Sequence, residues 1–293
     1  VPTSGIVVPG TEDKRHGFIV SASGRQSLVQ VAVTANAGVG KAIKGAVNTV
    51  VNNNIVSASA RESGAGGKHK SGVASSDDDA SHPASRGDIV ISAQGITDLK
   101  VFTEALQGGS DTQADGAVSV VVFGQTVTAL LKGNNKATGT VLVNAVTDNT
   151  ILNQSASLSG GKNGAAGDIG VLVYKDRTYA ELIGNADAAD VSVLALSDNT
   201  LINAASGIGV SGQSGGSGVA IVTYLLSETM ALIGDGTNRY KVNATNDITV
   251  QALSSETITA DIAGIAGSAI TSVAGAVNVL VNGLTVIANI ASS

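Results

Sequence analysis

Residues 140–153 read TVLVNAVTDNTILN, and residues 190–203 read DVSVLALSDNTLIN. Both segments place apolar residues at alternate positions, which is typical of a β-strand with one buried face. Residues 18–23 (FIVSAS), 88–94 (DIVISAQ) and 247–260 (DITVQALSSETITA) repeat the pattern. The five strand segments start at Phe18, Ile89, Val141, Val191 and Ile248, and the first interval between starts is the longest. The chain therefore contains five repeats of one β-rich unit.

A second strand pattern alternates with the first, as in residues 45–52 (GAVNTVVN) and 275–282 (GAVNVLVN). Glycine-rich turns such as residues 159–167 (SGGKNGAAG) separate the two patterns. Each half-repeat then spans roughly 22 to 29 residues, a length that cannot bury its own apolar face and must stack on its neighbours. The predicted fold is all-β, a single-stranded parallel β-helix (β-solenoid) of about ten coils. At a coil spacing of about 4.8 Å it would form a rod of roughly 48 Å.

The composition fits such a fold and excludes several classes of protein. The chain has 293 residues, with 37 Gly, 43% apolar, 14% charged and 2% aromatic residues. High hydrophobicity with low charge excludes an intrinsically disordered chain. A net charge of -6 argues against nucleic-acid binding. The absence of Cys excludes disulfides, thiol catalysis and zinc sites built on Cys. Small side chains suit a narrow interior, in which like residues stack between coils. One predicted column contains Asn48, Phe123, Tyr174, Tyr224 and Asn278.

The longest interval contains an insertion within residues 61–87. This segment contains eight of the forty charged residues and two of the three His. We predict one continuous solenoid over residues 1–293, from which residues 61–87 project as a polar loop. Insertions in solenoids often carry binding sites, although a solvated loop without a ligand also fits the composition. The candidate binding residues are Lys68, His69, Lys70, Asp77, Asp78, Asp79, His82, Arg86, Gly87 and Asp88.

Two features of this loop suggest specific ligands and also have structural explanations. Residues 77–79 with His82 could gather a cation such as Ca²⁺, but three consecutive Asp cannot all point to one centre from a strand. Residues 86–88 form the Arg-Gly-Asp tripeptide that some adhesion receptors recognise. However, Asp88 occupies the same repeat position as Asp190 and Asp247, which indicates a structural role.

No catalytic residue, metal or cofactor is predicted. The recurring acids fall at equivalent repeat positions, which is typical of turn and cap residues. They are Asp88, Asp190 and Asp247 in one set, and Asp148, Asp198 and Glu256 in the other.

The repeat phrases at residues 197–203 (SDNTLIN), 247–252 (DITVQA) and 275–282 (GAVNVLVN) resemble those of leukotoxin-like filamentous adhesins. These are very large exoproteins of Gram-negative bacteria, akin to filamentous haemagglutinins. The resemblance covers roughly residues 17–290. It implies a β-helical shaft that leaves the cell through an outer-membrane transporter of the type V kind. It supplies no catalytic residues.

The expected function is a structural and adhesive shaft segment of a longer, secreted or surface-exposed protein that is not an enzyme. Its expected partners are a host-cell or matrix receptor, or another surface. Exposed coil edges also predict end-to-end self-association of the isolated segment. Three alternatives remain: a β-helical enzyme acting on polysaccharide, the shaft of a secreted toxin, and an ice-binding solenoid. The uncharged residues 262–293 are long enough to span a bilayer, but the alternation at Val277, Val279 and Val281 predicts a strand.

Overall fold

The structure is a computed structural model, and it describes residues 18–60 and 87–291. These residues form an all-β fold in which all strand pairs are parallel. The strands are β1 (Phe18–Gly38), β2 (Ala42–Ile43), β3 (Ala46–Ala60), β4 (Ile89–Gly109), β5 (Thr112–Lys136), β6 (Thr140–Ala188), β7 (Asp190–Ile233), β8 (Val242–Ala244), β9 (Ile248–Ser268) and β10 (Thr271–Ile290).

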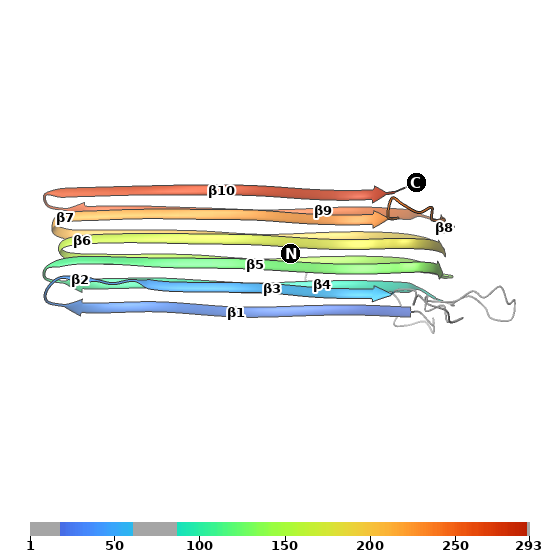
Figure 1. The fold of residues 1–293 in the computed structure, drawn as a ribbon, viewed down its shortest axis with the longest axis horizontal. Helices are drawn as coiled ribbons and strands as arrows, with labels where there is room; N and C mark the ends of the chain where they lie inside the picture. Colours follow the sequence, from blue (N-terminus) through green and yellow to red (C-terminus); the bar gives the residue numbers. More distant parts are fainter. Residues whose placement is uncertain (1–17, 61–86, 292–293) are drawn as a thin grey trace.

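Each repeat forms one flattened coil with two long arms, which run in opposite directions and are joined by a turn (Figure 1). The five first arms are β1, β4, the first halves of β6 and β7, and β9, and they form one parallel sheet. The five second arms are β3, β5, the second halves of β6 and β7, and β10. The short β2 and β8 extend this second sheet. The two sheets pack face to face and enclose the core.

The register confirms the repeat and the parallel β-solenoid class. The five predicted strand starts pair directly from coil to coil, from Phe18 with Ile89 through to Val191 with Ile248. The predicted number of coils is wrong, because each residue pairs with its equivalent in the next full repeat and not in the next half-repeat. A half-repeat is one straight arm, so the chain must reverse and return before it can stack.

The dimensions change with the number of coils. Five coils make a stack of roughly 24 Å, not 48 Å, and an arm of 21 residues extends roughly 70 Å. The molecule is therefore broad along its strands and short along the stacking direction.

Variation in repeat length is confined to one edge of the stack. The stretch from the start of the first arm to the start of the second is almost constant in length among the five coils. The stretch from the second arm to the next coil varies widely, and it is longest between β3 and β4. The segments 61–86 and 234–247 both lie in these return connections. The arms keep the same register on both sides of the longer return at residues 234–247, in which β8 pairs with the end of β6.

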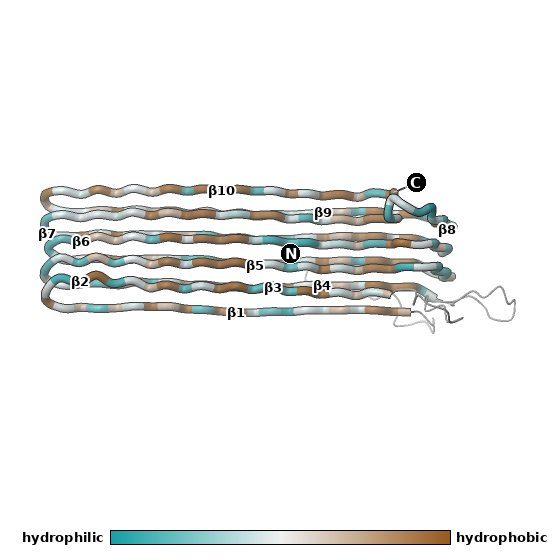
Figure 2. Tube along the Cα trace, in the orientation of Figure 1, coloured by the Kyte–Doolittle hydropathy of each residue, from teal (hydrophilic) through white to brown (hydrophobic). Residues whose placement is uncertain are grey.

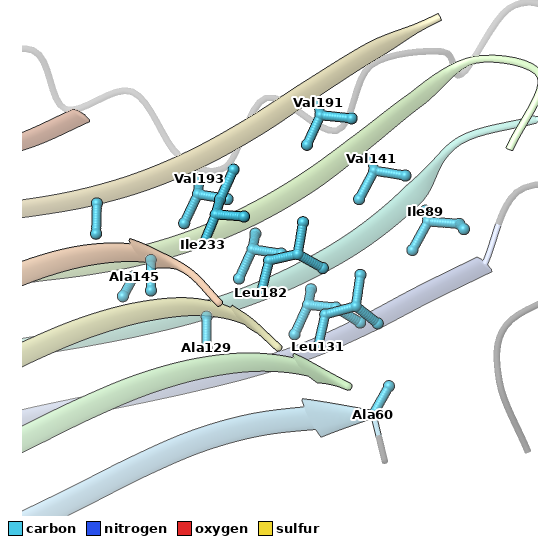
Figure 3. Packing of buried hydrophobic residues seen from close by; sticks show 14 of the residues in the cluster. Ala60, Ile89, Ala129, Leu131, Val141, Ala145, Leu182, Val191, Val193 and Ile233 are labelled. Atoms are coloured by element: carbon cyan, nitrogen blue, oxygen red, sulfur yellow. The ribbon is translucent and has the colours of Figure 1, made fainter. Parts of the chain in front are cut away.

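Alternate residues of both sheets point inward and are buried. At the return edge, Leu131, Leu182 and Ile233 of the second arms face Ile89 and Val141 of the first arms (Figure 3). Further along the arms, the rings of Phe123 and Tyr174 stack with centroids 5.5 Å apart. Apolar segments recur at matching places on successive strands (Figure 2), as the register requires.

The column predicted around these rings is only partly right. Phe123 pairs with Tyr174 as predicted, and the column continues through Leu225. Its outer members are Asn52 and Asn282. The predicted members Asn48, Tyr224 and Asn278 instead pair with Ser119, Val173 and Ile221. An offset of one residue moves a side chain to the opposite face of a sheet, which is why Tyr224 faces outward.

Gly184 shows why glycine is required at one of the returns. Its φ is +155°, and a Cβ there would overlap the backbone of Gly133 in the coil below. We expect Gly184→Ala to lower the free energy of unfolding by about 2 kcal/mol. Gly218→Ala is the matched control, because a Cβ at Gly218 meets no atom within 4 Å. Urea titrations of both variants measure the difference, and equal losses would contradict the steric explanation.

Candidate functional site

Most of the predicted binding residues lie outside the part of the chain that the structure describes. They are Lys68, His69, Lys70, Asp77, Asp78, Asp79, His82 and Arg86. Gly87 and Asp88 are described, at the corner that leads into β4.

The carboxylate of Asp88 is engaged within the protein. Its Oδ1 accepts a hydrogen bond from the backbone N–H of Thr140 in the next coil, at 2.8 Å. Asp190 repeats this contact two coils on, where its Oδ1 accepts from the N–H of Asp247 at 3.3 Å. These acids therefore join consecutive coils at their corners, in agreement with the structural role inferred from the repeat.

The second set of recurring acids does not lie at turns. Asp148 and Asp198 pair in the middle of the first arms and face outward. Burial and the nearby Asp198 raise the pKa of Asp148. Glu256 pairs with Asn199 rather than Asp198, and it faces inward. The expectation that these three acids occupy turns is wrong, because all three lie within the long straight first arms.

A buried polar cluster lies between the arms of the third and fourth coils. Asn149 donates to the hydroxyl oxygen of Tyr174 at 2.7 Å, and the Tyr174 hydroxyl donates to Oδ1 of Asn199 at 2.6 Å. Ser197 donates to Oδ2 of Asp176 at 2.8 Å. Asp176 is 1% exposed, and its Oδ1 has no partner among the described residues. The cluster fixes the alignment of both sheets.

Two interior carboxyl groups have raised pKa values. Burial raises the pKa of Asp176 to about 6, although Ser197, Asn199 and Thr178 donate hydrogen bonds to it. Burial also raises the pKa of Asp168 to about 6, against the opposing effect of hydrogen bonds from Ser157 and the Ala117 N–H. Each group therefore binds its proton more tightly in the folded protein than in the unfolded chain.

A shallow groove of about 310 Å³ opens on the outer face of the second-arm sheet. Gly124 lies between Asn53 and Lys175, its partners in the adjacent coils, and the amide oxygen of Asn53 lies 2.9 Å from the place that a Cβ of residue 124 would take. The groove is lined by Asn53, Gly124, Gln125, Thr126, Lys175, Asp176, Arg177, Leu226 and Glu228.

Charged side chains of two coils meet at the side of this groove. Arg177 Nε lies 3.2 Å from Glu228 Oε2, and the hydroxyl of Tyr179 donates to the same oxygen. Burial and Glu228 raise the pKa of Tyr179 to about 12. Asp176 and Arg177 are consecutive strand residues, so Asp176 points inward while Arg177 and Glu228 point outward. The two carboxylates that line the groove thus lie on opposite faces of the sheet and do not form an acid–base pair. The outer surface offers two cations, Lys175 and Arg177, and the side-chain amide of Asn53, which suit an anionic or hydroxyl-rich ligand.

Beside the groove, the same outer face carries an array of exposed apolar residues. Three columns of mainly Val residues, with Ile, Ala, Thr49 and Tyr224, stack across all five coils, and several of these residues remain open to solvent. The exposed members are Val47, Val51, Ile169, Val222, Val277, Val279 and Val281. Contiguous exposed apolar residues are typical of interaction surfaces.

Within residues 18–60 and 87–291, no three His, Asp or Glu side chains are grouped so that they could hold a metal ion. The same residues contain no helix capable of crossing a membrane, and the uncharged tail forms part of β9 and β10. Comparisons with protein-family models, curated proteins and solved structures gave no match.

Proposed function

We propose that the chain is a structural and adhesive segment of an exported filamentous protein, serving attachment to a host cell or another surface. The supporting observation is the stack itself. Five coils keep one register over both arms, and the first and last coils leave ladders open in the direction of stacking. Such an architecture extends by adding coils of the same kind.

The dimensions of the coil give the molecule large outer faces and a short stack. About 50 residues extend the stack by only about 4.8 Å, while each coil adds two strands of roughly 70 Å to the outer faces. Each added repeat therefore enlarges the outer faces much more than it lengthens the stack. The exposed apolar array and the groove beside Gly124 lie on one of these faces.

The attachment role is tested by replacing residues 61–86 with the segment KGNNKAT, which copies residues 132–138. Ala60 and Leu131 are register partners, and the N–H of Gly139 donates to the oxygen of Gly87, so the shortened return matches the next one. We expect the same β-sheet circular dichroism as the parent chain. Binding to cells or matrix-coated surfaces should fall at least about tenfold.

A second variant separates the sequence of the loop from its length. In this control, residues 61–86 keep their composition in shuffled order. If the loop carries the contact surface, the shuffled variant also loses binding. Full binding by the shortened and folded variant would contradict the proposed contact surface.

A further inference from the structure

The first and last coils both present long open edges. Among residues 18–60 and 87–291, β1 and β3 pair only with strands of the second coil, while β9 and β10 pair only with β7. Inward-facing residues of the last coil, such as Leu280 and Leu284, are about half exposed, because no strand of the described residues lies beyond β9 and β10. In parallel sheets, unpaired N–H and C=O groups along such an edge invite another strand.

We propose that a second copy of this chain stacks its first coil on the last coil, head to tail, in the register of the internal coils. This inference does not rest on the attachment role. In this register Asn48 of one copy follows Asn278 of the other, and Asn52 follows Asn282.

The match between the ends is visible in the sequence. Residues 45–52 and 275–282 are identical at six of eight positions, including both Asn. The three coils between them have no Asn in these two columns. Stacked Asn do bond between coils elsewhere in this fold, since Asn153 donates to Asn203 Oδ1 at 3.0 Å and Asn149 to Asn199 Oδ1 at 3.2 Å. In the proposed contact, Asn48 and Asn52 of one copy lie next to Asn278 and Asn282 of the other. These Asn can then form the same kind of coil-to-coil hydrogen bond.

Shape complementarity points to the same register. A pocket of about 420 Å³ at the return edge of the last coil is lined in part by Ile248, Ile290 and Tyr240. Phe18 heads the column that ends at Ile248. Phe18 is therefore the residue that a second copy would place against this pocket, while its small Ala60 would follow Ile290.

A polar pair is also completed across the junction. Burial raises the pKa of Glu256, and although Ser227 and Asn282 lie near its carboxylate, neither oxygen has a hydrogen bond of normal geometry among the described residues. Gln26 heads the column that ends at Glu256. The Gln26 Oε1 accepts from Asn52 and Asn54. Its NH₂ group has no partner in the described part of the chain, so it is available to donate to Glu256 of the next copy.

Charge sets the polarity of the contact. Within the described part of the first coil, residues 18–60 carry Arg25, Lys41 and Lys44 and no acid. Residues 248–291 of the last coil carry Glu256 and Asp261 and no base. Contacts between two first coils or two last coils would bring like charges together, so head-to-tail stacking is favoured. Because this interface does not close on itself, successive copies form filaments.

Engineered cysteines test the register directly, since the chain has none of its own. Val51 and Val281 are exposed members of one outward column. Across the proposed junction their Cα atoms would lie about 4.8 Å apart, within disulfide range. Within one copy they are four coil spacings apart, about 19 Å, so no internal bridge is feasible. Mild oxidation of the V51C/V281C variant should give a ladder of disulfide-linked multimers on a denaturing gel.

The control is V51C/V277C, in which the second cysteine is displaced by four residues along the strand. Multimers from the first variant and monomers from the second support the proposal. Monomers from both, or equal multimers from both, would overturn it.

Val51→Pro tests the open edge itself. The N–H groups of the buried, inward-facing Ala186 and Val191 bond to the following coil, and the N–H of Phe18 bonds in the same direction, to Asp88 of the second coil. Successive strand residues direct their N–H groups to opposite sides. The outward-facing Val51 therefore presents its N–H to the open edge, where proline is tolerated in a folded chain.

We expect Val51→Pro to weaken self-association at least about tenfold by sedimentation velocity, while Val51→Thr associates like the parent chain. Unchanged association of the proline variant, or a parent chain that stays monomeric at high concentration, would overturn the proposal.

Discussion

Replacing Tyr174 by alanine is expected to lower the free energy of unfolding by about 4 kcal/mol. The side chain is completely buried and stacks on Phe123. Its removal leaves a cavity between the two sheets and also withdraws the hydroxyl group from Asn149 and Asn199. Urea denaturation followed by circular dichroism measures the loss.

Two further variants divide this loss into its parts. Tyr174→Phe keeps the ring and removes the two hydrogen bonds of the hydroxyl group, while Asn149 and Asn199 stay bonded to each other. The loss of these two buried bonds should cost about 2 kcal/mol. Tyr224→Phe is the matched control, because Tyr224 faces outward in the next coil, and its loss should stay within about 0.5 kcal/mol. A Tyr174→Phe variant as stable as the parent would show that the polar cluster does not stabilise the fold.

Lowering the pH from 7.5 to 4 is expected to make the protein more stable. The pKa of Asp176 is about 6 in the folded protein and about 4 in an unfolded chain. A raised carboxyl pKa means that the favourable contribution is fully present below about pH 4 and is lost as the pH rises through about 6. For Asp176 the difference corresponds to about 3 kcal/mol.

Other groups modify this profile without reversing it. Burial raises the pKa values of Asp168, Asp115 and Glu256 as well, so these groups act in the same direction. Asp235 acts in the opposite direction, because hydrogen bonds from Asn238 and Thr237 hold its pKa below the usual range. The contribution of Asp235 to the free energy of unfolding is therefore lost mainly below pH 4.

Asp176→Asn tests the assignment of this pH dependence. The amide keeps an oxygen that can accept from Ser197, and it cannot ionise. We expect the variant to be more stable than the parent at pH 7.5 and to show a flatter profile between pH 4 and 7.5. Asp187→Asn removes the same charge at an exposed site and should keep the parent profile. A parent chain that loses stability steadily on acidification would show that the buried carboxyls do not dominate.

Much of the fold could be predicted from the repeat. The predicted strand starts from Phe18 to Ile248 have the register that the structure contains. The number of coils could not be found in this way. Period-two alternation identifies strands, but it is the same whether consecutive strands stack or fold back on each other. The structure distinguishes the two arrangements, because each arm is straight and the chain reverses direction before the next arm begins.

The interior polar site was harder to predict. Asn149 and Asn199 recur within the same Asp-Asn-Thr phrase, so the sequence contained a signal for them. Asp176 has no such signal, because its column partners are Gln125 and Ser227. A search for recurring acids therefore passes over the one that is most deeply buried. Asp176 faces inward because of its place in the alternation of the strand. The alignment of the half-repeats does not fix this place to within one residue.

The confinement of length variation to one edge has a consequence for protein engineering. The return at residues 234–247 is longer than the one at residues 137–139, and the arms on both sides of it keep their register, so this edge can receive a foreign peptide. The opposite turns, almost constant in length, offer no such freedom. Peptides grafted at consecutive returns would form a single file at intervals of about 4.8 Å. The fold thus provides a scaffold on which epitopes could be arrayed at molecular spacing along one margin.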